Sequence, residues 1–127
     1  MIYKIINIPS YVSQWTDEYF HKSAFDFPIR FPNKKVIKFL SAFRKNEKVE
    51  LYRGVNKYNE DNELISSWTY DKKIAKRYSL DGNGKVIKKE FYPNQILLDT
   101  TILTEEQKKY LGYDYKIDDH EVIVIKI

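Results

Sequence analysis

Three short fragments carry the residues best suited to chemistry, and the first is centred on an arginine. Arg53 comes near the end of an apolar segment, Val49 to Val55, and Gly54 follows it. A charged guanidinium in such a segment is costly unless its planar fork is paired, and phosphate is a natural partner. Gly54 has no side chain and would let a ligand approach the backbone closely. The alternative is an ordinary exposed arginine on an edge strand.

The second fragment places two hydroxyl groups on one side of a predicted strand. Strand alternation sends Ser67 and Thr69 to one face and Trp68 and Tyr70 to the other. Two hydroxyls on one wall can orient an arginine or a carboxylate by hydrogen bonds. The helix predicted next would fix this wall, and its inward-facing residues would be Ile74, Ala75 and Tyr78. Alternatively, the hydroxyls lie on the solvent side of the strand.

The third fragment introduces a very apolar terminal segment with acidic residues. A period of two puts Asp119 and Glu121 on one side of the chain and His120 on the other. Glu121 would accept a proton or a hydrogen bond from a ribose hydroxyl, or stabilise a developing positive charge, and Asp119 would address a second substrate. Alternatively, these charges protect an aggregation-prone strand.

The elements before these fragments are predicted to be mainly helical. A short strand over residues 2–8 ends at Pro9, and Ser10 caps a helix over residues 11–21. The apolar side of that helix comprises Val12, Trp15, Tyr19 and Phe20. Asn33 caps a second helix, in which Val36, Ile37, Leu40 and Phe43 share one face.

The rest of the chain reads mainly as strands. We predict strands over 49–55, 64–70, 85–92, 95–101 and 121–127, helices over 71–79 and from Thr104, and a turn at 81–84. Thr104 and Gln107 have the spacing of a capping box. Because helices precede strands, the sequence predicts a single α+β domain, 1–127, with a helical cover over 1–46 and a β-rich part over 47–127.

Composition restricts the chemistry and the partners. The 127 residues include no cysteine and two histidines, which disfavours thiolate chemistry and histidine-rich zinc sites. No window reaches the roughly 18 consecutive apolar residues of a membrane span, and the start lacks a signal-peptide cleavage site. We therefore expect a cytoplasmic protein of the producing or host cell, with no membrane partner. A net charge of +4 from 22 basic and 18 acidic residues supports nucleic-acid binding only weakly.

Taken in order, the fragments carry a family resemblance. Arg53-Gly54, then Ser67-x-Thr69 with the helix that contains Ala75 and Tyr78, then Asp119-x-Glu121 resemble the ADP-ribosyltransferases of the Arg-Ser-Glu class, which include bacterial toxins and phage-encoded enzymes. The match runs from about Val49 to the C-terminus. The resemblance implies N-terminal helices packed on a mixed or antiparallel split β-sandwich. It also implies transfer of ADP-ribose from NAD to a macromolecular acceptor, a host protein, with release of nicotinamide and without a metal.

The resemblance also assigns a role to each motif residue. Arg53 would hold the pyrophosphate of NAD, and the backbone of Gly54 would bind the nicotinamide carboxamide. Ser67 would brace Arg53 and Glu121, with support from Thr69, and Tyr78 would complete the NAD site. Glu121 would bind a hydroxyl of the nicotinamide ribose and stabilise the oxocarbenium-like transition state.

The sequence departs from the family next to Glu121 and leaves the acceptor open. Many arginine-modifying members have glutamate, and others glutamine, where this chain has Asp119. The segment 112–119 would recognise the target through Asp119, Tyr113 and Tyr115, although both tyrosines suit loop packing equally well. The alternatives are an NAD glycohydrolase, in which water is the acceptor, and a non-catalytic module of the same fold that binds protein or nucleic acid.

Overall fold

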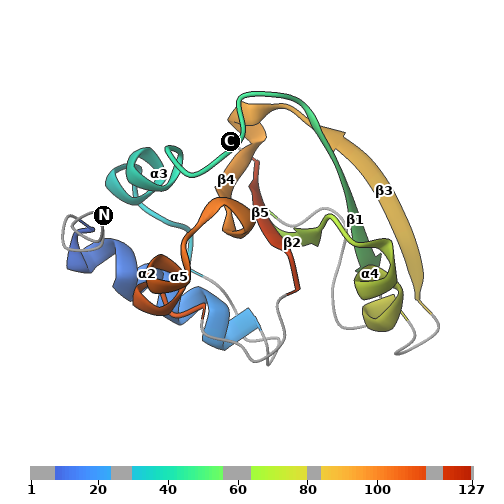
Figure 1. Cartoon of the computed structure of the whole chain (residues 1–127), viewed down its shortest axis with the longest axis horizontal. Helices are drawn as coiled ribbons and strands as arrows, with labels where there is room; N and C mark the ends of the chain where they lie inside the picture. The colour runs from blue at the N-terminus through green and yellow to red at the C-terminus, as the bar shows by residue number, and fades with distance from the viewer. Residues whose placement is uncertain (1–7, 24–29, 56–63, 80–83, 114–118, 127) are drawn as a thin grey trace.

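A five-stranded sheet, in which every pairing is antiparallel, organises the molecule (Figure 1). The computed structural model describes residues 8–23, 30–55, 64–79, 84–113 and 119–126. The strand order is β3-β1-β2-β5-β4. The strands are β1 (Val49–Val55), β2 (Ile65–Thr69), β3 (Lys85–Phe91), β4 (Ile96–Asp99) and β5 (Glu121–Ile125). The strands predicted from 49 onward are thus confirmed, with ends that differ by up to two residues.

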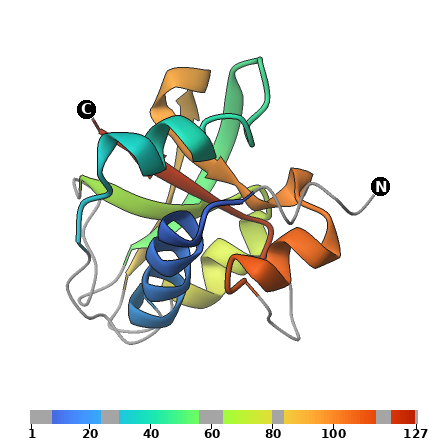
Figure 2. The same cartoon turned by 90° about the vertical axis from the view of Figure 1, so that its left-hand side faces the viewer.

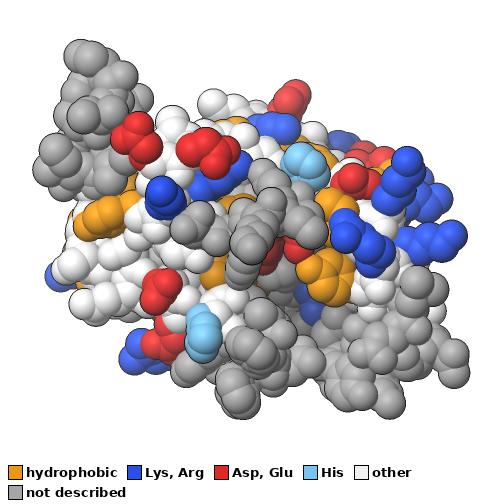
Figure 3. All heavy atoms as spheres, turned by 60° about the horizontal axis from the view of Figure 1, so that its bottom comes forward, with side chains coloured by type: hydrophobic (Ala, Val, Ile, Leu, Met, Phe, Trp, Pro, Cys, Tyr) orange, Lys and Arg blue, Asp and Glu red, His pale blue; other side chains and the backbone are white. Residues whose placement is uncertain are grey.

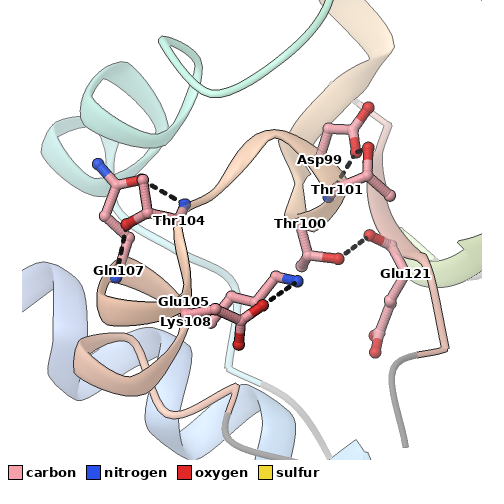
Figure 4. A network of polar contacts seen from close by, with 8 residues as sticks. All are labelled: Asp99, Thr100, Thr101, Thr104, Glu105, Gln107, Lys108 and Glu121. Carbon is pink, nitrogen blue, oxygen red and sulfur yellow. Dashed lines mark hydrogen bonds and ion pairs between the residues drawn. The ribbon is translucent and has the colours of Figure 1, made fainter.

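Two of the helices, α3 (Lys34–Leu40) and α5 (Glu105–Tyr110), begin where the predicted capping residues place them. The other described helices are α2 (Ser10–Ser23) and α4 (Lys72–Ser79), with short 3₁₀ turns η1 (Pro93–Gln95) and η2 (Thr100–Ile102). The Asn33 side chain accepts a hydrogen bond from the Val36 amide at 3.0 Å, as predicted. Thr104 and Gln107 form the predicted capping box, with bonds of 2.9 and 3.1 Å (Figure 4).

The predicted α+β class is confirmed for the described residues. Ser10 is the first residue of α2 and does not precede the helix, which shifts the predicted start by one residue. The predicted strand over 2–8, apart from Ile8, and the turn at 81–84, apart from Gly84, lie outside the described part of the chain. No helix in the described residues is long and apolar enough to cross a bilayer.

Two apolar clusters stabilise the sheet, one on each face. The larger joins α2, α3 and residues that flank α5 to β4 and β5, and Figures 1 and 2 show these helices on the same side of the sheet. Its fully buried members include Val12, Phe20, Leu40, Leu98 and Ile123. The smaller cluster comprises Leu51, Trp68, Phe91, Ile96, Val122 and Val124. Trp68 belongs to this second cluster and faces away from Ser67, as strand alternation predicts.

The paired stretch of backbone is shortest between β1 and β2. β1 pairs with β3 along its whole length, from Val49 opposite Phe91 to Val55 opposite Lys85. With β2, however, β1 shares the single register pair Tyr52 and Thr69. The β1–β3 pair therefore diverges from β2, β5 and β4 (Figure 1).

Gly54 allows α4 to pack against the diverging pair of strands, β1 and β3. A Cβ atom at this position would lie 2.1 Å from the Ala75 carbonyl oxygen and 2.7 Å from the Ser79 amide nitrogen. Because both are backbone atoms of α4, they cannot move aside without shifting the helix. The close approach that we expected of a ligand at Gly54 is thus made here by α4, and the predicted contact of its backbone with nicotinamide stays a prediction.

We expect Gly54→Ala to destabilise the protein. The added methyl would force α4 away from β1, and overpacking of this kind costs about 2–3 kcal/mol. That cost exceeds the gain of below about 1 kcal/mol from a less flexible unfolded chain. Urea denaturation followed by circular dichroism measures the difference. An unfolding midpoint equal to that of the wild type would contradict the packing role of Gly54.

Candidate functional site

A hydrogen bond between side chains of two adjacent strands forms the centre of the site. In the pairing of β2 with β5, Thr69 lies opposite Glu121 and Ser67 opposite Ile123. Ser67 and Glu121 are therefore diagonal neighbours on the same face, where side chains can meet. Ser67 Oγ donates to Glu121 Oε2 at 2.6 Å, and Glu121 is 9% exposed. The register of the sheet thus orients a nearly buried carboxylate.

Arg53 joins this pair from β1. Its Nη1 donates to the Ser67 carbonyl oxygen at 2.8 Å, and the residue is only 6% exposed. If the pairing of β1 with β2 continued past Tyr52, Gly54 would lie opposite Ser67. The strands diverge instead, and the guanidinium supplies a donor to the Ser67 carbonyl. The alternative of an exposed arginine on an edge strand is therefore wrong.

Tyr19 also belongs to the site, although its spacing in the sequence predicted only a place on the apolar side of a helix. Its hydroxyl lies 2.5 Å from Ser67 Oγ, and the residue is 2% exposed. A serine hydroxyl has one hydrogen, which Ser67 gives to Glu121, so Tyr19 is the donor in this contact. The ring of Tyr19 stacks on Trp15 at 5.3 Å. A tyrosine on the apolar side of a helix indicates a buried hydroxyl that needs a hydrogen-bond partner, but helical spacing does not identify that partner.

Thr69 connects the end of β2 to the segments on either side of it. Its hydroxyl donates to the Asp119 carbonyl oxygen at 2.7 Å and accepts a bond from the Asp71 amide at 3.0 Å. Thr69 is 5% exposed. It holds both the start of α4 and the approach to β5, and in this sense supports the site. Its predicted contact with NAD stays a prediction.

Tyr78 does not face inward as predicted. It is 53% exposed on α4, and its hydroxyl donates to Asp119 Oδ2 at 2.5 Å. Partial burial, this hydrogen bond and the negative charges of Asp119 and then Glu121 raise the pKa of Tyr78 well above its ordinary value, against a smaller opposite effect of Arg77. Both carboxylates therefore act on this hydroxyl, so Tyr78 lies at the edge of the site next to them.

The start of β5 is held by its backbone. Thr100 Oγ1 donates to the Glu121 carbonyl oxygen at 2.5 Å, while the carboxylate of Glu121 points away from Thr100 (Figure 4). His120 precedes Glu121 with a φ of 49°, a left-handed conformation that interrupts the extended chain. The alternation that we used to place Asp119 and Glu121 on one side therefore does not apply across His120, which is exposed. What the two carboxylates share is that the charge of each raises the pKa of Tyr78.

Of the two tyrosines expected to contact a target, the structure describes one. Tyr113 is 3% exposed and packs against Phe20 with ring centroids 4.8 Å apart. Tyr113 is therefore a core residue, which agrees with the alternative of loop packing and not with contact with a target. Tyr115 lies outside the described residues.

The arrangement suits stabilisation of positive charge on a bound substrate. A carboxylate held by a serine hydroxyl in a nearly buried site can interact strongly with a cationic transition state, because little water screens it. In the described part of the chain, no group of three or more His, Cys, Asp or Glu residues is arranged to hold a metal ion. The described site presents a carboxylate, hydroxyls and a guanidinium.

Tyr19→Phe should lower the free energy of unfolding by about 1 kcal/mol, since it removes a buried hydrogen bond to Ser67. Tyr11→Phe is the matched control, because Tyr11 lies on the same helix and is 41% exposed. Urea denaturation of the two variants and the wild type gives the comparison. Equal stability of the two variants would show that the Tyr19 hydroxyl does not anchor Ser67.

Comparison with known proteins gives no family assignment. No family model, no curated protein and no solved structure matches the chain significantly.

Proposed function

We propose that this protein is a mono-ADP-ribosyltransferase that transfers ADP-ribose from NAD to a macromolecular acceptor and releases nicotinamide. The observation that carries the proposal is the hydrogen bond from Ser67 Oγ to Glu121 Oε2, with Arg53 bound to the carbonyl of the same serine. These are the three residues after which the Arg-Ser-Glu class is named. They come from three different strands and meet where β1 and β2 share their single register pair.

The residues of the site suit the chemical groups of NAD. A guanidinium has five N–H donors, one of which is directed at Ser67, and phosphate is the anion that its fork pairs with best. A carboxylate such as Glu121 can accept a hydrogen bond from a ribose hydroxyl. We assign Arg53 to the pyrophosphate and Glu121 to the nicotinamide ribose, with Gly54, Thr69 and Tyr78 lining the site.

In the proposed reaction, the bond between ribose C1′ and the nicotinamide nitrogen breaks, and nicotinamide leaves with the bonding electrons. Positive charge develops on the ribose, and the Glu121 carboxylate stabilises it. A nucleophile of the acceptor then bonds to C1′ and loses its proton. The hydroxyls of Ser67 and Tyr19 fix the position of the carboxylate during this change.

The finer fold belongs to the same proposal. We interpret the divergence of β1 and β3 from the other three strands as the split of an ADP-ribosyltransferase β-sandwich. The single register pair between β1 and β2 supports this interpretation. The acceptor, which we propose is a host protein, would reach the site beside Asp119 and Tyr78, whose side chains are hydrogen-bonded at its edge.

Glu121→Gln should lower the rate of nicotinamide release at least about 100-fold, because the amide carries no charge to stabilise the transition state. The measurement is nicotinamide release from NAD with and without host-cell lysate, together with intact-mass analysis of the lysate proteins. Glu106→Gln, an exposed change on α5, is the control and should behave as the wild type.

The same assay separates the three hypotheses. Release that needs both Glu121 and lysate, with the mass of ADP-ribose added to a discrete protein, identifies a transferase. Release without lysate identifies a glycohydrolase or a self-modifying enzyme. Absence of release with NAD and lysate present would contradict the enzymatic proposal and leave a binding module.

Arg53→Lys should weaken NAD binding about tenfold, because a lysine ammonium cannot form the paired hydrogen bonds of the guanidinium fork. Isothermal titration calorimetry measures the affinity. Arg44→Lys is the matched control, since Arg44 Nη1 also donates to a strand carbonyl, that of Ile96 at 3.3 Å, outside the site. Unchanged affinity in Arg53→Lys would remove the phosphate role from Arg53.

A further inference from the structure

The outward face of α4 is a compact group of positive charges. Ile74, Ala75 and Ser79 are buried against the sheet. The four basic residues of α4 are spaced i, i+1, i+4 and i+5, which puts them together on the opposite side of the helix. All four are exposed, and we call them the basic face of α4: Lys72, Lys73, Lys76 and Arg77. Figure 3 shows basic side chains gathered on the right of the view, the side on which α4 and β3 lie in Figure 1.

Among the described residues, these cations have no acidic partner. Some exposed cations elsewhere do have one, such as Arg30 with Glu18 at 3.2 Å and Lys48 with Glu90 at 3.6 Å. Within the described ranges, no member of the basic face forms an ion pair. Asp71, the nearest acidic residue in sequence, accepts a hydrogen bond from the backbone amide of Lys73 through its side chain. As far as the described residues show, the basic face is exposed and its four charges are not ion-paired.

Helix stability does not account for the position of all four cations. Lys76 and Arg77 lie in the last turn, where positive charge interacts favourably with the helix dipole. Lys72 and Lys73 lie in the first turn, which contains no acidic residue and where the dipole disfavours cations. Like charges four residues apart also repel each other. An external anion would remove both penalties.

We propose that the basic face of α4 binds nucleic acid through its phosphate backbone. An eight-residue helix is about 12 Å long, and duplex DNA carries one charge per about 1.7 Å of its axis, so a segment of this length presents about seven phosphates. Nucleic acid is uniformly negative, as the basic face is uniformly positive. A protein surface carries both signs, and a mixed set of charges on α4 would match it better. Three of the four cations are lysines, which act as point charges on phosphates and need no defined base.

The basic face lies next to the site described above. Arg77 is adjacent to Tyr78, whose hydroxyl binds Asp119, and the charge of Arg77 acts on that hydroxyl. Nucleic acid bound to α4 would therefore lie beside the same edge of the site. The binding itself does not depend on the proposed reaction, because it needs neither NAD nor Glu121.

The test compares two triple variants that remove equal charge from two exposed helical surfaces. One is Lys72→Gln, Lys73→Gln and Lys76→Gln on α4, and the matched control is Lys34→Gln, Lys35→Gln and Lys38→Gln on α3, where all three lysines are also exposed. Fluorescence anisotropy with a labelled 20-base-pair DNA duplex and a labelled 20-nucleotide RNA, at several salt concentrations, gives affinities and salt slopes. Circular dichroism verifies the fold of each variant.

We expect the α4 variant to bind at least about tenfold more weakly, with a salt slope reduced by about two to three, and the α3 variant to stay within about threefold of the wild type. Equal weakening of both variants would overturn the proposal, because net charge alone would then explain binding. Failure of the wild-type protein to bind either probe would also overturn the proposal. So would binding of polyglutamate that is as tight as that of nucleic acid and that depends equally on α4. Nicotinamide release is measured separately on the same samples, so failure of the proposed reaction is distinguishable from failure of nucleic-acid binding.

Discussion

The limited pairing of β1 with β2 is the constraint on which the site depends. The two strands share one register pair, Tyr52 with Thr69, and the pairing does not continue to the position at which Gly54 would face Ser67. A backbone carbonyl needs a donor, and Arg53 Nη1 donates to that of Ser67. The guanidinium that satisfies the sheet thus also brings positive charge beside Ser67, whose hydroxyl binds Glu121. One arginine serves the backbone and the site together.

The donor order of the central hydrogen bonds makes α2 part of the site. Glu121 accepts from Ser67, and Ser67 must then accept from Tyr19, since a hydroxyl has a single hydrogen to give. Each bond fixes the rotamer of the next side chain. The prediction that residues 1–46 form a mainly helical cover agrees with α2 and α3, but it missed this contribution. The N-terminal helix buries the larger core and also anchors the serine that orients the carboxylate.

What the sequence predicted depended on neighbours in the chain. Strand alternation placed Ser67 and Thr69 on the face opposite Trp68, and capping chemistry located α3 and α5, because these signals lie within four residues. Contacts between distant segments were not predictable in the same way. The partner of Tyr19 is 48 residues away, and Tyr113, which lies outside any helix, packs against Phe20 of α2. Residue spacing does not contain the tertiary packing that decides such contacts.

The inner face of α4 packs closely against β1, and its outer face is charged and exposed. Gly54 permits the close packing. The inner face approaches β1 so closely that a methyl at Gly54 would meet the backbone of Ala75 and Ser79. Close packing leaves α4 little freedom to shift or rotate, and the hydrogen bond from Tyr78 to Asp119 fixes it further relative to the start of β5. The basic face therefore has a fixed direction relative to Glu121. Nucleic acid held on α4, as we propose, would therefore lie in one orientation relative to this carboxylate.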